Sequence, residues 1–489
     1  MKPAFSALNK KYKKHKKHKY MKIRIFSLLA AVLCAFSSCV NNDYGYEVKN
    51  GVIVYNTPDR PADQISMIGF AADPIETVRV GFVGLGMRGP SAVGRFLHID
   101  GIEITALCDL YPDKVEGVQK MLERNGFPAA AGYSGQDGWK ELCDREDIDL
   151  VYLATPWQVH VEMAVYAMEH GKHVAIEVPA ATDVEGCWQL VNTAERTRKH
   201  CMMLENCVYD FFELTTLNMA QQGLFGEIIH TEGAYIHNLD PYWSEYQDNW
   251  RYEFNKVNRG DVYPTHGLGP ACQVLNIHRG DKMNTLISMD TKAFNGLKVA
   301  EQFGETEYEN GDHTITLIQT EKGKIIEIQH NVVTPRPYNR MYQVEGTEGF
   351  ANKYPNEGYS IRTEGRNFDE QKAVDDLTGS ASDGEAYLSD EVRDALMAQY
   401  KHPIVRDIEE KAKEVGGHGG MDFIMDYRLI YCLRNGLPLD QDVYDAAEWS
   451  CLGELTRVSI ENGNIPVVMP DFTRGDWNKV QGYKHAMQE

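Results

Sequence analysis

The fold of this chain is decided by the stretch VRVGFVGLGMRG at residues 78–89. Its first half, Val78–Val83, has the length and the apolar, β-branched composition of a buried strand. The second half fits the pattern G-x-G-x-x-G at Gly84, Gly86 and Gly89. Such glycines permit a tight turn and a close backbone approach to a pyrophosphate, which the next helix meets with its NH groups. Because the pattern follows a strand and opens a helix, it predicts a dinucleotide-binding turn.

An acidic residue follows the next expected strand, Glu103–Cys108. Asp109 lies twenty residues after Gly89, where a carboxylate accepts hydrogen bonds from the adenosine ribose hydroxyls. The same carboxylate repels a 2′-phosphate, and Leu110 and Tyr111 supply no base to receive one. The sequence therefore favours NAD over NADP. A glycine turn in some other α/β protein is the alternative.

Short apolar runs alternate with helical periods as far as residue 204. Beyond the helix that follows Gly89, the expected helices are Pro112–Arg124, Val161–His170 and Asp183–Arg198, and the expected strands are Ile148–Ala154, His173–Glu177 and Cys201–Leu204. This alternation predicts a doubly wound parallel sheet. We therefore expect residues 78–209 to form a Rossmann-type NAD-binding domain.

The alternation of strand and helix patterns changes after about Phe212. Segments that alternate like half-buried antiparallel strands are Glu227–Ile236, His313–Gln319, Lys324–His330 and Tyr342–Glu345. A long loop is expected at Asn238–Pro264, and helices at Asp390–Tyr400, Ile404–Val415, Asp422–Asn435 and Val443–Asn462. The predicted α/β fold thus pairs the Rossmann domain with residues 210–489, an α+β substrate domain with an open antiparallel sheet and C-terminal helices.

The amino-terminal residues are typical of an export signal. Residues 1–38 hold ten Lys/Arg and no Asp/Glu, and the apolar run Ile25–Phe36 is too short to span a bilayer. Ser37, Ser38 and Cys39 then resemble a bacterial lipoprotein box. We expect a lipoprotein signal peptide over residues 1–38, lipidation and membrane anchoring at Cys39, and a periplasmic or outer-membrane location. An ordinary cleaved signal, or a translation start at Met21, remains open.

Charge and cysteine usage exclude several other classes. The whole chain has a net charge of −21, and its basic residues are concentrated before residue 39, so the body is more acidic still. Such a body repels phosphate backbones, so no nucleic acid is expected, although Lys10–Lys19 resembles a basic arm. The cysteines show no Cys-x-x-Cys pair or regular spacing, so no metal site or disulfide scaffold is expected. Residues 39–77, with the polar stretch Asn41–Asp73, are predicted as a linker and loosely docked chain. The sequence is also compatible with a homo-oligomer.

Two motifs carry a family resemblance. The segment Ala154-Thr155-Pro156-Trp157-Gln158-Val159-His160 and the segment Glu177-Val178-Pro179 resemble the superfamily typified by glucose–fructose oxidoreductase and inositol dehydrogenase. That superfamily pairs a Rossmann domain with an open antiparallel sheet. Its dehydrogenases usually carry Lys between the Glu and the Pro, where it helps to move a proton. Here the position is Val178, which argues against an ordinary dehydrogenase.

With Val178 at this position, the sequence resembles one branch of the superfamily, glycoside hydrolase family 109, the NAD-dependent α-N-acetylgalactosaminidases. The other segments that carry the resemblance are Met87-Arg88, Ala180-Ala181, Glu205-Asn206, Tyr209, Trp250-Arg251, Tyr263-Pro264-Thr265-His266-Gly267, Arg336-Pro337-Tyr338-Asn339, Glu345-Gly346-Thr347-Glu348-Gly349 and Gly417-His418-Gly419-Gly420-Met421-Asp422. The resemblance runs from roughly residue 78 to residue 471. The loop Asn238–Asn249 is less close, so the substrate is less defined than the family.

The resemblance implies roles for individual residues. The implied cofactor contacts, besides the glycine turn, are Met87, Arg88, Asp109, Trp157, His160, Glu177, Val178 and Asn206. The implied sugar contacts are Tyr235, Arg251, Tyr263, His266 and Tyr338. His266 and Tyr209 are the implied catalytic pair, with their roles undivided. From the residues alone, His266 could belong to a capped turn, Tyr209 and Trp157 to packing, Arg251 to a surface salt bridge, and His418 to a structural glycine loop.

The resemblance also implies an unusual, retaining glycosidase reaction with no net redox change. Hydride leaves the sugar C3, the resulting ketone acidifies C2–H, a base takes that proton, and the aglycone leaves from C1. Water then adds and the hydride returns, so NAD should stay bound. A sugar dehydrogenase of the wider superfamily and a non-catalytic sugar-binding lipoprotein are the alternatives.

Overall fold

The computed structural model describes residues 44–364 and 383–488. The expected signal peptide and the lipidation site Cys39 lie outside these residues. In the described part of the chain, no helix combines the length and apolar character needed to cross a membrane.

The first sheet has six strands in the order β5-β4-β3-β6-β7-β8. Its strands are β3 (Val78–Val83), β4 (Ile102–Asp109), β5 (Ala131–Ser134), β6 (Leu150–Leu153), β7 (His173–Ile176) and β8 (Cys201–Met203). All neighbouring pairs are parallel, and Val83 pairs with both Cys108 and Leu153. The carboxyl ends of the strands therefore meet at one edge, and the predicted doubly wound sheet is confirmed.

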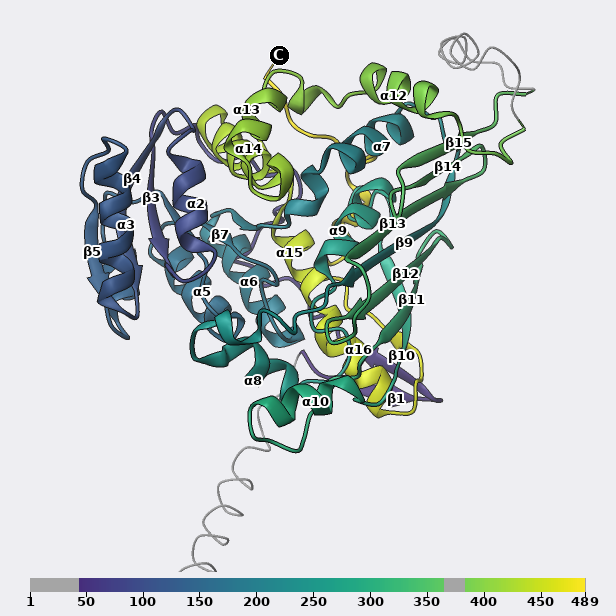
Figure 1. The fold of residues 1–489 in the computed structure, drawn as a ribbon, viewed down its shortest axis with the longest axis horizontal. Helices are drawn as coiled ribbons and strands as arrows, with labels where there is room; N and C mark the ends of the chain where they lie inside the picture. Colours follow the sequence, from purple (N-terminus) through teal and green to yellow (C-terminus); the bar gives the residue numbers. More distant parts are fainter. Residues whose placement is uncertain (1–43, 365–382, 489) are drawn as a thin grey trace, which may run out of the picture. The chain divides into compact units, whose positions relative to one another are not determined.

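Helices connect these strands, as the alternation predicted. They are α2 (Gly89–Phe96), α3 (Pro112–Arg124), α4 (Gly138–Cys143), α5 (His160–Glu169) and α6 (Val184–Thr197). Local sequence sets their ends: Pro112 occupies the first turn of α3, and the Asp183 side chain accepts a hydrogen bond from the Gly186 NH at the start of α6. Figure 1 shows α2 and α3 beside β3, β4 and β5.

The second sheet has ten strands in the order β1-β2-β16-β10-β11-β12-β9-β13-β14-β15. Its strands are β1 (Tyr46–Lys49), β2 (Val52–Tyr55), β9 (Ile228–Ile236), β10 (Met283–Asp290), β11 (Thr314–Thr320), β12 (Ile325–Asn331), β13 (Asn339–Gly346), β14 (Gly349–Asn352), β15 (Gly358–Ile361) and β16 (Val467–Val468). Most pairs are antiparallel, as expected. The pairs β9–β12 and β2–β16 are parallel, so the sheet is mixed.

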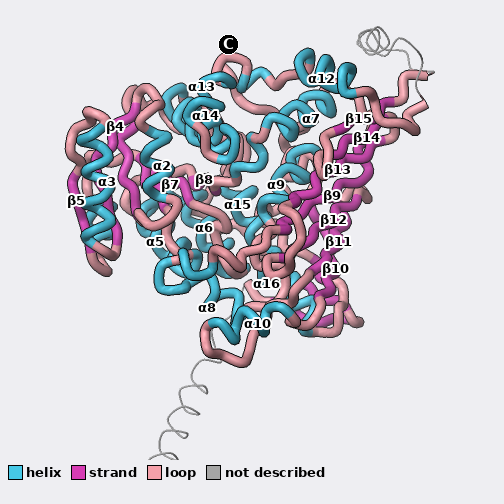
Figure 2. Tube along the Cα trace, in the orientation of Figure 1, coloured by secondary structure: helices cyan, strands magenta, loops and turns pink. Residues whose placement is uncertain are grey.

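The remaining helices pack mainly around this second sheet and between the two sheets (Figures 1 and 2). They are α7 (Phe211–Gln221), α8 (Trp250–Val257), α9 (Thr265–Val274), α10 (Asn295–Gln302), α12 (Asp390–Gln399), α13 (Glu409–Val415), α14 (Met421–Asn435), α15 (Val443–Ser450) and α16 (Leu452–Glu461). Helix α9 packs on β9, α16 packs on β10, and α15 packs on α6 and β8. The cores of the two predicted halves are thus joined through α9, α15 and α16.

Two expected irregular segments carry regular structure. Within the predicted linker, β2 pairs with β16, and both Ile53 and Tyr55 are buried. The Tyr55 hydroxyl donates to Glu454 at 2.8 Å, so the segment after residue 45 is not loosely docked. The expected loop Asn238–Pro264 contains α8. Both elements are short and gain their stability from tertiary contacts, which local periodicity does not reveal.

Candidate active site

A cavity of ≈ 610 Å³ opens at the carboxyl edge of the parallel sheet. The sequence-predicted residues that line it are Gly84, Gly86, Met87, Arg88, Asp109, Trp157, Glu177 and Val178 for the cofactor, and Arg251 and Tyr263 for the sugar. The structure therefore brings most of the predicted cofactor set together with part of the predicted sugar set, as expected for a ligand at this edge of a doubly wound sheet.

The glycine turn is shaped to receive a ligand. A Cβ at Gly84 would lie 2.5 Å from the Ala154 carbonyl oxygen, and one at Gly89 would lie 2.0 Å from the Gly84 oxygen. Gly84 also has a φ of +91°, which strongly favours glycine. A Cβ at Gly86, by contrast, would meet nothing within 4 Å. The first and third glycines thus allow the close packing of the turn, and the second leaves open space for a pyrophosphate.

Asp109 is fixed where the adenosine ribose is expected. One of its carboxylate oxygens accepts a hydrogen bond from the Leu85 NH at 2.6 Å, and the other accepts from the Tyr111 NH at 2.9 Å. The carboxylate ties the glycine turn to the end of β4 and lines the cavity. Its negative charge at this position fits the ribose of NAD and opposes a 2′-phosphate.

Two buried polar atoms in the cavity wall lack hydrogen-bond partners among the described residues. They are Oε1 of Glu177 and Nε of Arg251, although the Arg88 guanidinium lies 3.7 Å from Glu177 and 3.5 Å from Asp422. Buried polar groups are normally satisfied, so these atoms mark places where a bound ligand would supply the partner. Together with the open glycine turn, they show that the residues present fit a dinucleotide.

Three predicted cofactor residues lie behind the cavity wall. Gly89 serves the turn, and the buried His160 ring lies between the Thr155 and Pro179 carbonyl oxygens at 2.8 and 2.9 Å. Asn206 donates to Asp422 at 2.6 Å. The His160 contacts join the loops after β6 and β7, and the Asn206 contact joins the segment after β8 to the start of α14. Among the described residues, His160 and Asn206 therefore act as supports for the groups that line the cavity.

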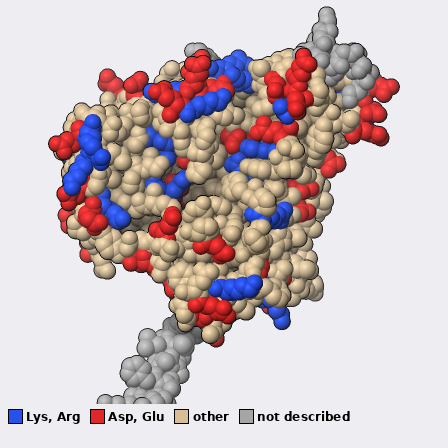
Figure 3. Space-filling view, in the orientation of Figure 1, with Lys and Arg blue, Asp and Glu red and all other residues tan. Residues whose placement is uncertain are grey.

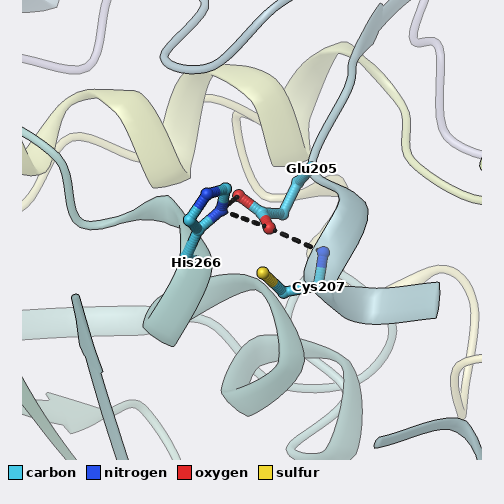
Figure 4. Close-up of side chains that lie close together, drawn as sticks. All are labelled: Glu205, Cys207 and His266. Atoms are coloured by element: carbon cyan, nitrogen blue, oxygen red, sulfur yellow. Dashed lines mark hydrogen bonds and ion pairs between the residues drawn. The ribbon is translucent and has the colours of Figure 1, made fainter. Parts of the chain in front are cut away.

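His266 forms a buried dyad with Glu205. Its Nδ1 lies 2.8 and 2.9 Å from the two Glu205 carboxylate oxygens, and Figure 4 shows the ring facing that carboxylate. Burial alone would raise the pKa of Glu205, but the charge and hydrogen bond of His266 outweigh it and lower that pKa. The ionised carboxylate therefore favours a proton on Nδ1 and leaves Nε2 as the basic nitrogen.

The backbone places this dyad. Glu205 follows β8, and His266 lies in the first turn of α9. A Cβ at Gly233 would lie 2.3 Å from the Gly267 carbonyl oxygen, so α9 and β9 touch backbone to backbone beside His266. Sequence reasoning missed Glu205 as a functional residue. The available signal was a carboxylate at the carboxyl end of the last parallel strand.

Tyr263 links the dyad to the cavity. Its hydroxyl lies 3.4 Å from His266 Nε2, at the long limit of a hydrogen bond. The Tyr263 ring stacks on Trp157 with centroids 5.4 Å apart and lies 4.6 Å from the Tyr235 ring centroid. The structure therefore forms a continuous chain from Glu205 through His266 to Tyr263, which lines the cavity.

Arg251 is enclosed by aromatic rings. Its guanidinium carbon lies 4.8 Å from the Tyr263 ring centroid and 5.2 Å from that of Trp157. Its Nη1 donates to the Tyr246 hydroxyl at 2.6 Å. Arg251 is only 6 % exposed, so the alternative of a surface salt bridge is wrong. A buried guanidinium with a free Nε beside the cavity is suited to bind a neutral oxygen of a sugar.

The last two predicted sugar contacts meet at a histidine that the sequence prediction did not include. The Tyr235 hydroxyl lies 2.9 Å from His237 Nδ1, and the half-exposed Tyr338 ring packs edge-on against His237 at 5.2 Å. Burial and the charge of Arg251 lower the pKa of His237 to about 4. His237 is therefore neutral at physiological pH and joins Tyr235 to Tyr338.

Tyr209 is not brought to this group. Its side chain is fully buried, and its hydroxyl donates to Asp440 at 3.3 Å. Burial and the charge of Asp440 raise the pKa of Tyr209 well above its ordinary value. Burial raises the pKa of Tyr263 in the same direction, so the positions of the two hydroxyls, and not their pKa values, separate Tyr209 from Tyr263. The sequence placed Tyr209 just after β8, but its ring turns into the core instead of toward His266.

Cys207 and His418 are two further side chains close to the predicted site residues. The ligand atoms of Glu205, Cys207 and His266 lie within 4.8 Å of one another. The carboxylate and Nδ1 bond to each other, and burial raises the pKa of the Cys207 thiol. His418 is half-exposed and bonds Asp422 at 2.9 Å, which in turn contacts Arg88.

Comparison with known proteins covers both parts of this site. Residues 78–205 match the family "Oxidoreductase family, NAD-binding Rossmann fold". Residues 209–479 match "Glycosyl hydrolase 109, C-terminal domain". Among solved structures, levoglucosan dehydrogenase in complex with NADH superposes with a TM-score of 0.60 at 15 % identity, covering 81 % of this chain and 100 % of that one. This likeness shows the fold.

Much closer relatives exist among the curated proteins. "Glycosyl hydrolase family 109 protein 1" of Bacteroides thetaiotaomicron is 60 % identical over 447 residues, which cover 91 % of this chain and 95 % of the relative. The protein of the same description from Phocaeicola vulgatus is 61 % identical, with 88 % and 92 % covered. A family 109 protein of Porphyromonas gingivalis is 60 % identical, with 89 % and 93 % covered. The chain is therefore a member of glycosyl hydrolase family 109, with a glycosidase family's C-terminal domain joined to an NAD-binding Rossmann domain.

Proposed function

We propose that this glycosidase hydrolyses a terminal α-linked N-acetylgalactosamine, or a related sugar, with a tightly held NAD and no net redox change. The observation that supports it is the chain Glu205–His266–Tyr263, which runs from the buried end of β8 to the wall of the dinucleotide cavity. This reaction needs a cofactor site and a proton acceptor side by side, and we assign these two roles to the cavity and to His266.

NAD⁺, when bound, supplies the acceptor and later the donor of the C3 hydride. The protein's part is proton transfer and orientation. The Glu205 carboxylate holds the Nδ1 proton of His266 and stabilises the imidazolium that forms when Nε2 accepts a proton. We assign to Nε2 the removal of a sugar proton, either directly or through the Tyr263 hydroxyl. Tyr263 thereby takes the place that the sequence gave to Tyr209.

We assign binding of the sugar to Arg251, Tyr235 and Tyr338. Arg251 lines the cavity, where its guanidinium would donate to a hydroxyl or acetamido oxygen. Tyr235 and Tyr338 flank His237 and would offer ring faces and hydroxyls to the sugar. Hydrogen-bonded neighbours orient these groups before substrate arrives, which limits the ordering cost of binding.

Val178 supports the redox-neutral assignment over a net oxidation. Its apolar side chain lines the cavity at the position where the related dehydrogenases carry Lys. With no ammonium at this position, proton transfer falls to the groups around His266. A dehydrogenase is the competing function, and it predicts that NADH accumulates with turnover.

The test is an assay of purified residues 40–489 with a panel of nitrophenyl α- and β-glycosides, in which absorbance follows nitrophenol and NADH together. Release of nitrophenol without NADH, lost in His266→Ala, is the expected result and identifies the preferred sugar. Accumulation of NADH without glycoside cleavage would establish the dehydrogenase instead. Retained dinucleotide with neither signal across a broad panel would favour the sugar-binding alternative.

We also propose that the enzyme is an exported lipoprotein anchored at Cys39. The supporting observation is the sequence of residues 21–39, which runs from basic to apolar to small residues before a cysteine. Metabolic labelling with a radioactive fatty acid should label the full-length protein, whereas Cys39→Ser should remain unlabelled. Equal labelling of both would refute lipidation at this residue.

A further inference from the structure

A hydrogen bond joins two walls of the cofactor cavity. The Tyr111 hydroxyl donates to Asp248 Oδ2 at 2.6 Å across 137 residues of sequence. Tyr111 follows β4 in the Rossmann half, and Asp248 precedes α8 in the other half. Both residues line the cavity, and the bond is exposed to solvent.

The segment Tyr246–Asn249 is held at its other side as well. The Tyr246 hydroxyl accepts from Arg251 at 2.6 Å, and its ring packs edge-on against Trp250. Asp248 and Asn249 both adopt positive φ, 55° and 53°, which costs free energy for residues other than glycine. The surrounding contacts therefore keep this segment in a conformation that points Asp248 toward Tyr111.

The Rossmann end of the contact belongs to the adenosine site. The backbone NH of Tyr111 donates to Asp109, which is the carboxylate expected to bind the ribose. Breaking the Tyr111–Asp248 hydrogen bond therefore frees a side chain directly beside the carboxylate expected to bind the ribose. The bond itself involves neither Glu205 nor His266, which reach the cavity through Tyr263, although Tyr246 of the same segment bonds Arg251 beside Tyr263.

We propose that residues 246–249 form a latch over the bound dinucleotide and that the Tyr111–Asp248 hydrogen bond closes it. The inference rests on the proposed function for the identity of the cofactor, and adds how the protein retains it. With the latch closed, a dinucleotide in the cavity would be enclosed by the carboxyl edge of the parallel sheet and by residues 246–248 of the latch, which both line it. Its release then requires this bond to break and the segment to move, which slows dissociation.

The test measures dissociation of NAD directly. Protein loaded with NAD is diluted into an excess of an NAD-consuming enzyme, and the loss of bound NAD is followed with time. Removing a single exposed hydrogen bond to a charged group should raise the dissociation rate about fivefold to tenfold. Tyr111→Phe lacks the bond and should show this full increase. Asp248→Asn keeps an amide oxygen that can accept from the Tyr111 hydroxyl but lacks the charge, so its increase should be smaller, and the double variant should give no more than Tyr111→Phe alone.

A matched control lies in the same domain. The Tyr166 hydroxyl donates to Asp144 at 2.8 Å in an equally exposed contact, and neither residue lines the cavity. Tyr166→Phe should leave the dissociation rate unchanged. Unchanged rates in Tyr111→Phe and Asp248→Asn, with NAD bound normally at the start, would overturn the latch alone. A parent protein that contains no NAD as purified and binds none in an equilibrium fluorescence titration would overturn both the latch and the proposed function.

Discussion

The substitution Glu205→Gln tests the proton-transfer assignment most directly. It keeps the shape of the side chain but removes the charge that faces His266. In the parent, both carboxylate oxygens lie within 2.9 Å of Nδ1, and one of them also accepts from the Cys207 NH at 2.9 Å. A glutamine can place its oxygen at that shared position, but its NH₂ group then faces Nδ1 where an acceptor stood. The imidazolium formed during proton transfer loses its counter-charge.

The expected magnitude follows from that lost attraction. Two unit charges about 4 Å apart interact by about 4 kcal/mol at an effective dielectric constant of about 20. If this attraction develops as Nε2 takes the proton, its loss raises the barrier by the same amount, which is a factor of about 10³ in kcat. The value falls within the range of about 10²–10⁴ that positioned acid–base groups contribute. KM should change much less, because Glu205 does not line the cavity.

The assay is steady-state release of nitrophenol from the preferred glycoside, with NAD content and the thermal transition measured on the same samples. The matched control is Glu448→Gln, which removes the carboxylate from another buried Glu–His pair, Glu448 with His278 at 3.3 Å. That variant should lose stability and keep kcat. Glu205→Asp should restore part of the activity. A folded, NAD-loaded Glu205→Gln protein with kcat within tenfold of the parent would refute the dyad as the proton-transfer group.

Three further substitutions follow from the same geometry. Arg251→Lys should lower kcat/KM about tenfold, mainly through KM, because an ammonium does not reproduce the planar contacts with Tyr263 and Trp157; an unchanged KM would contradict this role. Tyr209→Phe should cost about 1 kcal/mol of stability and leave kcat within about threefold, and a larger loss of kcat would return Tyr209 to the catalytic pair. Burial raises the pKa of Asp261 to about 7, because the protein interior disfavours the charged carboxylate. The stability that protonated Asp261 gives to the folded state is therefore complete below the ordinary pKa of aspartate and is lost as the pH rises through 7. Asp261→Asn should abolish that loss, about 2–3 kcal/mol between pH 5 and 8, and equal pH dependence of denaturant unfolding in both proteins would contradict it.

The cofactor half of the site was accessible from the sequence because its determinants are local. Gly84, Gly86 and Gly89 share one turn, and Asp109 follows the adjacent strand, so strand order and spacing place them together. The helix α3 was predicted with its observed bounds because Pro112 marks its start. By contrast, β5 is the four-residue segment AGYS, which lacks the apolar run that marks the equally short β6 and β7, and α4 has only six residues, which is too short for a helical period to stand out.

The catalytic half depends on contacts that no local pattern contains. Glu205 and His266 are 61 residues apart, and their meeting depends on the close approach of α9 to β9 at Gly233 and Gly267. Position after a parallel strand was a sound reason to place Tyr209 near the cleft. It did not determine which way the ring turns, because the buried Asp440 acceptor comes from 231 residues further along the chain.

The proposed latch favours redox-neutral hydrolysis over net oxidation of the sugar. A dehydrogenase must exchange its cofactor in every turnover, so a device that slows dissociation would limit its rate. A glycosidase that takes hydride from its substrate and returns it has the opposite requirement. Loss of the reduced cofactor in mid-cycle would strand an oxidised sugar on a protein unable to complete hydrolysis. A bond such as Tyr111–Asp248, placed at the adenosine side, would restrain the cofactor, and the bond from Arg251 to Tyr246 of the same segment would link this restraint to the proposed sugar site. Cofactor retention is therefore a requirement of redox-neutral chemistry, and in an exported enzyme the scarcity of free NAD would make it stricter.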